Sequence, residues 1–434
     1  MTPLEMIHGL NRADQPPDVQ HQSELCVLDL IGIAVGGHGT KLSAIIRDHA
    51  SETFGGSAPM LFDARRASPA GVALAAGMTI DSLDGHDGFN PAKGHVGASL
   101  FPAALALAHQ AGASGGDFLT AIVIGYEIGS RTALAQHASV PDYHTSGSWG
   151  AVACAAAGAR LLGLDAGQTR HALGIAEYHG PRSQMMRCID HPTMLKDGSG
   201  WGAMTGVSAV HLAAKGFTGA PALTVEQVPQ FWGDLGQRWL ILEQYFKPFP
   251  VCRWAQAPAE GVLALARAHD LTSHQVDRIE VTTFHEAVRL ATNRPANTEE
   301  AQYSTSFPCA VALVRGDITP ADIADDALND PEILRLSQGL VMVESDHANA
   351  NFPSGRLAKV SLVLRDGTRL DGPYISPRWD HLHPPTEAEL RAKYHALADP
   401  VLGRARATAI KAALSDLPDT PLATLSTLLF QPIN

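Results

Sequence analysis

Cysteine is scarce in this sequence, and the few that occur are widely spaced. There are five, an odd number, and no two of them form a Cys-x-x-Cys pair. This spacing argues against a disulfide framework and against an iron–sulfur cluster. We therefore expect reduced thiols, which are typical of a cytoplasmic protein. The cysteines are Cys26, Cys154, Cys188, Cys252 and Cys309.

The common cofactor and metal motifs are also missing. No Gly-x-x-x-x-Gly-Lys-Ser/Thr loop occurs, and no Gly-x-Gly-x-x-Gly follows a strand pattern, so neither nucleotide-binding motif is present. His381 with His383, or Cys188 with His191, would each supply only two ligands, whereas a zinc site usually needs four. We expect a protein that uses no metal and no cofactor.

Positive charge is in deficit, with 32 Lys and Arg against 44 Asp and Glu and a net charge of -12. Such a chain is a poor match for nucleic acid, whose phosphates require a basic face. There is no uninterrupted apolar run of about 18 residues, so no membrane span is expected. The N-terminus lacks the basic start and apolar core of a signal peptide. An anionic substrate remains compatible with the net negative charge, because a local cationic pocket can lie within an acidic protein.

What the sequence does contain is a succession of helical patterns up to Trp239, for example over residues 23–36, 117–135 and 149–162. From Tyr245 onward, prolines interrupt the chain and strand-like alternation appears at 278–284, 340–344 and 358–364. The sequence predicts a mainly α protein with an α+β part. The large all-helical domain covers residues 1–245 with a C-terminal return over 396–434, and the smaller α+β domain covers 246–395.

One loop carries an unusual density of charge. Two Ala/Leu-rich runs flank Asp81–Leu100, which holds three Asp, two His and one Lys. Charged residues rarely lie among apolar helices unless they are paired or functional. Because perturbed titratable groups cluster at functional sites, we interpret this loop as part of a site. The residues are Asp81, Asp84, His86, Asp87, Lys93 and His95.

Further basic and titratable residues lie in Gly- or Pro-rich loops beside apolar helices. Cations bind carboxylates, and the helix N-termini that follow such loops favour negative charge. Histidine is the residue best suited to proton transfer near neutral pH. These loops therefore indicate a cleft for a polycarboxylate, built from His144, Arg182, Arg187, Lys196 and Lys247.

At these positions the sequence resembles the MmgE/PrpD family over nearly its whole length. The motifs that carry the resemblance are Leu83–Asp87 with His95, His144 before a small-residue helix, Lys196–Gly206, Lys247–Arg253, and Tyr303 with Phe307. The resemblance implies a large helical domain made from both chain ends, a smaller α+β lid, a homodimer and cofactor-free chemistry. It also implies a site between the domains.

The family pattern implies an Asp, two His and two Lys in that site, which correspond here to Asp84 or Asp87, His95, His144, Lys196 and Lys247. Which His acts as the base is open. Other polar residues of the same segments are expected to bind substrate, namely Tyr143, Arg182, Arg187, Cys252, Arg253 and Tyr303.

Two departures from the decarboxylases of this family bear on the reaction. Cys252 stands where they have a His, and Phe307 stands where they have an active-site Tyr. We therefore expect a hydro-lyase of the 2-methylcitrate dehydratase type, which removes a proton α to a carboxylate of a small hydroxy-polycarboxylate. Epimerisation of a dicarboxylate is the alternative, followed by decarboxylation and by a non-catalytic or metal-dependent role on the same fold.

Overall fold

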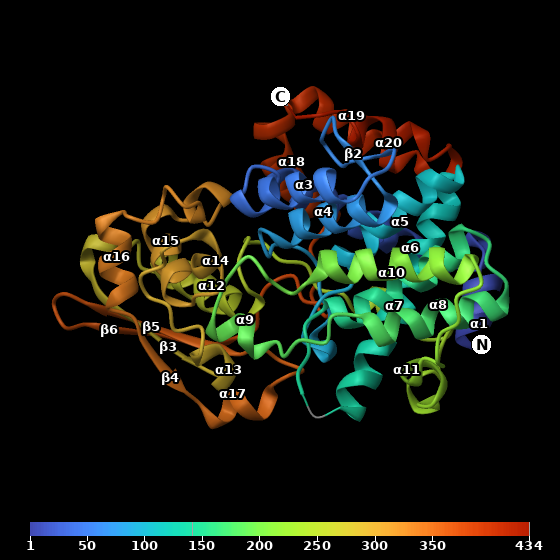
Figure 1. Ribbon diagram of the computed structural model, residues 1–434. Coiled ribbons are helices and arrows are strands. Elements are labelled where there is room, and N and C mark those ends of the chain that lie inside the picture. Colours follow the sequence, from blue (N-terminus) through green and yellow to red (C-terminus); the bar gives the residue numbers. More distant parts are fainter. Residues whose placement is uncertain (141, 434) are drawn as a thin grey trace.

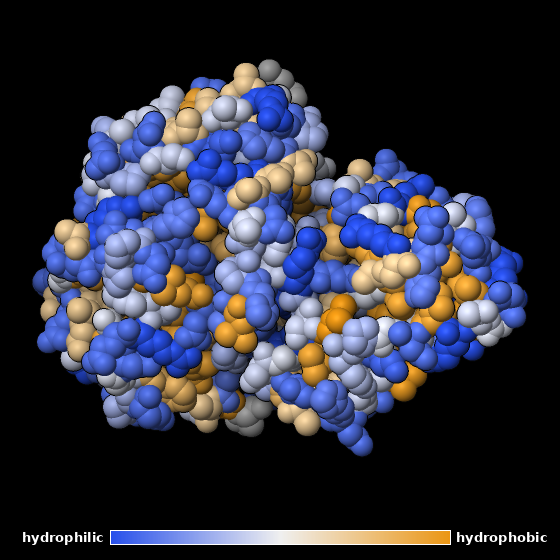
Figure 2. Space-filling view, turned by 180° about the vertical axis from the view of Figure 1, so that it is seen from behind, coloured by the Kyte–Doolittle hydropathy of each residue, from blue (hydrophilic) through white to orange (hydrophobic). Residues whose placement is uncertain are grey.

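The computed structural model describes residues 1–140 and 142–433. Figure 1 shows helices from both chain ends gathered into one large part, and a smaller part made from the segment between them. Seen from behind, the two parts meet along a broad junction with a notch at its upper edge (Figure 2). This arrangement confirms the predicted fold class, mainly α with an α+β part.

The larger part is helical because its segments carry long apolar faces and well-placed caps. Ser68 and Ser114 cap their helices by accepting hydrogen bonds from the backbone of Gly71 and Asp117. Its helices are α1 (Pro3–Gly9), α2 (Pro17–Gly37), α3 (Lys41–Thr53), α4 (Pro69–Asp81), α5 (Gly97–Ala111), α6 (Gly115–Ser139), α7 (Gly147–Leu161), α8 (Ala166–His179), α9 (Met186–Asp190), α10 (Ser199–Ala214) and α11 (Leu223–Glu226), with a short hairpin of β1 (Ala58–Pro59) and β2 (Arg66–Ala67).

The smaller part is a four-stranded sheet in the order β4-β3-β5-β6, with β3 and β4 parallel and the other pairs antiparallel. Helix α12 contacts β5 and β6, and α15 packs against α12 and α16 (Figure 1). The strands are β3 (Val276–Thr283), β4 (Val341–Glu344), β5 (Ala358–Leu364) and β6 (Arg369–Ile375). The helices are α12 (Arg253–Ala268), α13 (His285–Val288), α14 (Thr298–Gln302), α15 (Ser306–Arg315), α16 (Pro331–Gln338) and α17 (Asp346–Asn351).

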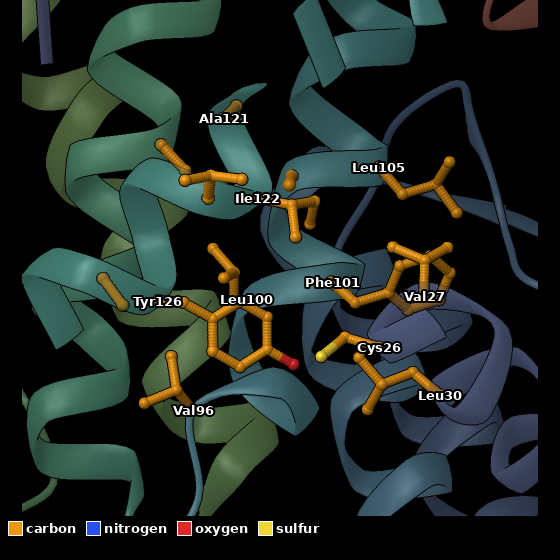
Figure 3. Close-up of a cluster of buried hydrophobic side chains, with 14 of the residues drawn as sticks. Cys26, Val27, Leu30, Val96, Leu100, Phe101, Leu105, Ala121, Ile122 and Tyr126 are labelled. Atoms are coloured by element: carbon orange, nitrogen blue, oxygen red, sulfur yellow. The ribbon is translucent and has the colours of Figure 1, made fainter. Parts of the chain in front are cut away.

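Each part has a hydrophobic core of its own. Figure 3 shows a section of the larger core, where Cys26 and Leu30 of α2 face Leu100 of α5 and Tyr126 of α6. The chain rejoins this core by Trp379, earlier than the residue 396 that the sequence suggests. The returning helices are α18 (Glu387–Leu402), α19 (Arg404–Ser415) and α20 (Ala423–Leu429).

None of the described helices is by itself both long and apolar enough to cross a bilayer. The bent pair α2 and α3 meets the length and composition criteria only when the two are taken together. Most of α2 is buried in the core of the larger part.

The packing of α4 on α10 joins the fold to the charged loop. A Cβ on Gly77 of α4 would lie 2.6 Å from the Cα of Gly200 of α10, so only glycine permits this approach. The contact brings the end of α4 to the start of α10, where the Ser199 N–H donates to Asp81 Oδ2 at 3.2 Å. Two chain segments far apart in sequence thus meet at one point.

We predict that Gly77→Ala lowers the free energy of unfolding by about 1–3 kcal/mol, the usual range for overpacking a tight core. Gly39→Ala is the matched control, because its Cβ would meet nothing within 4 Å. Chemical denaturation of both variants gives the comparison. Equal stabilities would contradict the close packing of α4 on α10.

Candidate active site

The charged loop between α4 and α5 is buried rather than solvated. Asp81, Asp84, His86 and Asp87 are each at most 3% exposed, and His95 is 7% exposed. Charges removed from water at this depth require compensation by opposite charge or hydrogen bonds. Ion pairs and hydrogen bonds with neighbouring segments supply most of this compensation, and they define the site.

Lys247 and Asp84 form a fully buried ion pair. The Lys247 ammonium donates to Asp84 Oδ1 and, at 2.7 Å, to the Asp84 carbonyl. Burial alone would raise the pKa of Asp84, but the charge of Lys247 outweighs it and lowers that pKa to about 2. Asp84 is therefore a carboxylate throughout the physiological range.

His95 is held as a neutral base. Its Nδ1 lies 2.5 Å from the Asp87 carbonyl oxygen, which can only accept, so Nδ1 carries the proton and Nε2 the lone pair. Burial, together with His86 and Lys247, lowers the pKa of His95 well below its usual value. The Nε2 atom lies 3.9 Å from Asp84 Oδ1 and 3.7 Å from Asp197 Oδ2.

Asp197 supplies a carboxyl group of a different kind. One oxygen accepts from Ser146 Oγ at 2.6 Å, and the other has no partner among the described residues. Burial, and then the charges of Asp81 and Asp84, raise the pKa of Asp197 to about 7. Near neutral pH this group can hold a proton beside His95, whereas Asp84 cannot. The two carboxyls are thus suited to different roles.

Lys196 brings a second ammonium group to the site. Its Nζ donates to Gln302 Oε1 at 2.6 Å and lies 4.9 Å from the centre of the Tyr303 ring. Within the described part of the chain it forms no ion pair, although it is 2% exposed. A buried ammonium with only neutral partners is available to an anionic ligand.

Backbone strain is concentrated here as well. Asp84, Lys93 and Lys196 have φ values of 44°, 55° and 50°, in the left-handed region that residues with a Cβ rarely adopt. Each such residue costs about 1–2 kcal/mol and persists only where its surroundings enforce it. The strain orients side chains that the apolar core alone would not hold in place.

These groups surround a small closed cavity of about 20 Å³, room for about one water molecule. A larger cavity of about 250 Å³ lies on the other side of α9, with Lys196 and Arg187 in its wall. Met185 and Ile189 line the inner cavity and Cys188 lines the outer one, so α9 separates the two. A polycarboxylate requires an opening of the inner cavity beyond this closed state.

The structure brings together most of the residues expected from the sequence. The inner cavity is lined by Asp84, His95, Tyr143, Cys252, Arg253 and Tyr303, while Lys247 contacts Asp84 and the charge of Lys196 acts on it. Arg187 lines only the outer cavity, and Arg182 is exposed and lines neither. The loop around α9 places both arginines outside the inner site.

The structure corrects two further expectations. Asp87 is not the site carboxylate, because it turns away from the cavity and accepts from the Tyr126 hydroxyl at 2.8 Å. His144 does not line the inner cavity either. It pairs with Gln184 in an extended bridge, and since neighbours in extended chain point to opposite sides, the inward direction belongs to Tyr143. Both ring nitrogens of His144 are buried without a partner among the described residues.

Phe307 also differs in position from the expectation. It is fully buried in the core of the smaller part, where it cannot reach the cavity. The aromatic side chain that lines the cavity from this segment is Tyr303. The presence of Phe at 307 therefore removes no hydroxyl from the inner site in this state.

Several site residues escape the sequence analysis. Asp197 directly follows Lys196 in a glycine-rich stretch, so its position in the sequence could have identified it as a site residue. Tyr245, Gln302 and Arg356 reach the site only through the packing of the two parts. His86 carries out a supporting role, with Nε2 3.4 Å from Asp81 Oδ1 and its ring 4.4 Å from that of His95.

Asp84, His86 and His95 each place a ligand atom within 4.8 Å of the others, a spacing that a metal ion could use. The Lys247 ammonium already occupies the carboxylate of this group, and His95 Nδ1 is engaged by the Asp87 carbonyl. The positive charge of the site is thus supplied by lysine, which is a poor match for a metal in the same place.

An acid–base pocket flanked by lysines, between a helical part and a smaller α+β part, defines an enzyme-like site. Comparison with known proteins identifies the family to which the chain belongs. Residues 4–231 match the MmgE/PrpD N-terminal domain and residues 249–418 match the MmgE/PrpD C-terminal domain. The chain belongs to the MmgE/PrpD family and is an enzyme of that family.

Curated relatives carry two kinds of name. The chain is 24% identical to the cis-aconitate decarboxylase-like protein oryM of Aspergillus oryzae, over 94% of this chain and 92% of that protein. It is 24% identical to the cis-aconitate decarboxylase of Aspergillus terreus, over 92% and 89%. It is 26% identical to the mitochondrial 2-methylcitrate dehydratase of Yarrowia lipolytica, over 49% and 45%.

We predict that Lys247→Met lowers the free energy of unfolding by about 3–5 kcal/mol, because it leaves the Asp84 carboxylate buried without a partner. The double variant Lys247→Met/Asp84→Asn should recover most of that loss. Urea denaturation at pH 7 measures each variant.

The control for this cycle is Arg238→Met, which removes a half-exposed arginine paired with Glu243 and should cost less than about 1 kcal/mol. If the double variant were as unstable as the sum of its two single changes, the pair would not be the source of the stability.

Proposed function

We propose that this protein is a cofactor-independent hydro-lyase that acts on a small hydroxy-polycarboxylate, of the type that 2-methylcitrate dehydratase handles, by removing a proton α to a carboxylate. The observation that carries the proposal is the neutral His95 imidazole, whose unprotonated Nε2 faces a cavity flanked by cations. A base poised in this way suits the removal of a weakly acidic proton.

In the proposed reaction, His95 Nε2 takes the proton from the carbon next to a carboxylate, and the C–H electron pair forms the new C=C bond. The neighbouring C–OH bond breaks, and the hydroxyl leaves as water with a proton from Asp197, which can hold one near neutral pH. The charge that develops on the carboxylate is offset by Lys196, while Lys247 keeps Asp84 ionised.

Decarboxylation is the second candidate, and one observation favours it. The relatives that match nine-tenths of the chain are named as cis-aconitate decarboxylases, whereas the dehydratase match spans about half. Against it stands Cys252, which lines the cavity and whose pKa burial raises to about 12, so that it is a weaker proton donor than a histidine there. Epimerisation would use the same base, but no feature of the cavity favours it.

The experiment is incubation with a panel of hydroxy- and unsaturated polycarboxylates in deuterated water, followed by NMR. We expect loss of water from one hydroxy acid, with deuterium entering at the α-carbon in the reverse direction. His95→Gln should lower kcat by about 10²–10⁴. His274→Gln is the control, because that side chain is 81% exposed in the smaller part.

His144→Gln runs in parallel to settle whether its unpartnered ring takes part. Release of CO₂ without hydration or dehydration would replace the hydro-lyase by a decarboxylase. Full activity of His95→Gln would refute the assignment of the base.

We also propose that the protein is a homodimer, as the resemblance implies. Support comes from α10, which crosses the front of the larger part in Figure 1 and exposes Trp201 and Leu212 on one face, with Leu195 just before it. Exposed apolar groups gathered in this way are typical of an interface.

We predict that light scattering at micromolar concentration gives twice the chain mass of 45.9 kDa. The variant Trp201→Glu/Leu212→Glu should shift the protein toward the monomer, and Val341→Glu, at an exposed position on β4, should not. A wild-type mass of one chain would contradict the proposal.

A further inference from the structure

Arg356 lies at one end of the inner cavity and is only 3% exposed. It belongs to the smaller part, in the loop just before β5, and faces a site whose acid–base groups come from the larger part. No sequence pattern singles it out. Its hydrogen-bond and ion-pair partners differ from those of Arg253, the other arginine in the cavity wall.

The positive charge of the Arg356 guanidinium is hardly compensated by hydrogen bonds or by opposite charge. Nη2 donates to the Asn90 carbonyl at 3.1 Å and Nη1 to the Gly355 carbonyl at 3.4 Å, while Nε has no partner among the described residues. These contacts use two of five N–H donors. Within the described chain no carboxylate lies within ion-pair distance, and the nearest aromatic face is that of Phe352 at 4.8 Å.

Burial lowers the pKa of Arg356 to about 10, so the group stays charged at neutral pH. A buried charge without a counter-ion is strongly unfavourable. Structures keep such groups mainly where a ligand supplies the opposite charge.

Arg253, its neighbour in the cavity wall, shows the contrast. It pairs with Asp380 at 2.8 Å and lies over the Tyr245 ring at 3.9 Å, so its charge is satisfied within the protein. Lys93, at the same end as Arg356, has the Tyr143 ring at 4.3 Å. Burial, together with the charge of Arg356, lowers the pKa of Lys93. At this end of the cavity, neither Arg356 nor Lys93 has a described carboxylate within ion-pair distance, and only the more distant charge of Glu286 acts on Lys93.

We propose that Arg356 binds a carboxylate of the substrate, at the end of the molecule away from the carbon that His95 deprotonates. The inference rests on the proposed function for the identity of the site. It adds that the substrate carries at least two carboxylates, one at Lys196 and one at Arg356. Because Lys196 belongs to the larger part and Arg356 to the smaller part, the bound substrate joins the two parts.

Carboxylate is the ligand class that this geometry suits. A guanidinium with a free Nε and free Nη hydrogens presents a flat edge, which two carboxylate oxygens can meet at once. A single small ion would use one donor and leave the others unsatisfied.

The test uses inert probes, so that binding is measured separately from turnover. Propane-1,2,3-tricarboxylate has no hydroxyl group to eliminate, and butyrate carries a single carboxylate. Calorimetric titration should show that the wild type prefers the tricarboxylate. Arg356→Gln should weaken its binding on the order of 10²-fold, as expected when one partner of a buried charge pair is removed, with little effect on butyrate.

Two variants accompany it. Arg356→Lys keeps the positive charge but loses the planar guanidinium. Its affinity for the tricarboxylate should therefore lie between those of the wild type and Arg356→Gln. Arg369→Gln is the matched control, an arginine of β6 that is 47% exposed and pairs with Glu280. It should bind as the wild type does.

Thermal denaturation provides a second readout. Without ligand, Arg356→Gln should melt at a higher temperature than the wild type, because the uncompensated charge is gone. With the tricarboxylate, the wild type should gain several degrees, by mass action, and Arg356→Gln should gain little.

Unchanged tricarboxylate affinity in Arg356→Gln, or a wild type that binds neither probe, would overturn the inference. Failure of the proposed function looks different. A protein that turns over no hydroxy acid but loses tricarboxylate binding on Arg356→Gln keeps Arg356 as a carboxylate site and loses the hydro-lyase.

Discussion

Charge removed from water must be compensated inside the protein, and this constraint organises the centre of the molecule. The loop after α4 buries Asp84 almost completely, and Lys247 compensates its charge directly. A second ammonium, that of Lys393, holds the next residue, donating to the Gly85 carbonyl at 2.7 Å and to Asp29 at 2.6 Å. Two lysines from the later half of the chain thus fix a loop from its first quarter.

That fixed loop sets the state of the catalytic candidate. With the Asp87 carbonyl held at 2.5 Å from Nδ1, His95 has one tautomer, and its lone pair points into the cavity. The same burial that keeps His95 neutral also keeps a proton on Asp197 near neutral pH. Base and acid arise from one environment, and Lys247 keeps Asp84 ionised beside His95.

Much of the fold was accessible from the sequence because helix periodicity is a local property. The pattern over 23–36 became α2, and the strand patterns near 278 and 358 became β3 and β5. Helix α12 was missed because Pro248, Pro250 and Pro258 indicate a break, yet Pro258 lies inside the helix. Tertiary packing against β5 and β6 outweighs the lost hydrogen bond there.

The site was accessible only in part, for the same reason. Asp84, His95, Lys196 and Lys247 stand out because each is a charge among glycines, prolines and apolar residues. The choice between Asp84 and Asp87 depends on which way a turn points, and here a left-handed φ at Asp84 decides it. Arg356 has no such local signal, because its position in the cavity wall depends on how the smaller part packs against the larger part.

The two ends of the cavity differ in how their charge is balanced, and this difference links the fold to the chemistry. At the acid–base end, Asp84 and Lys247 balance each other, so His95 keeps its tautomer without ligand. At the other end, neither Arg356 nor Lys93 has a described carboxylate within ion-pair distance, although the charge of Glu286 acts on Lys93. A ligand bearing carboxylates would lower the free energy of the closed state most, because it neutralises cations that closing removes from water. An empty protein gains less by closing, although an apolar cluster that joins α9 to Trp254 and Phe284 of the smaller part also holds the two parts together.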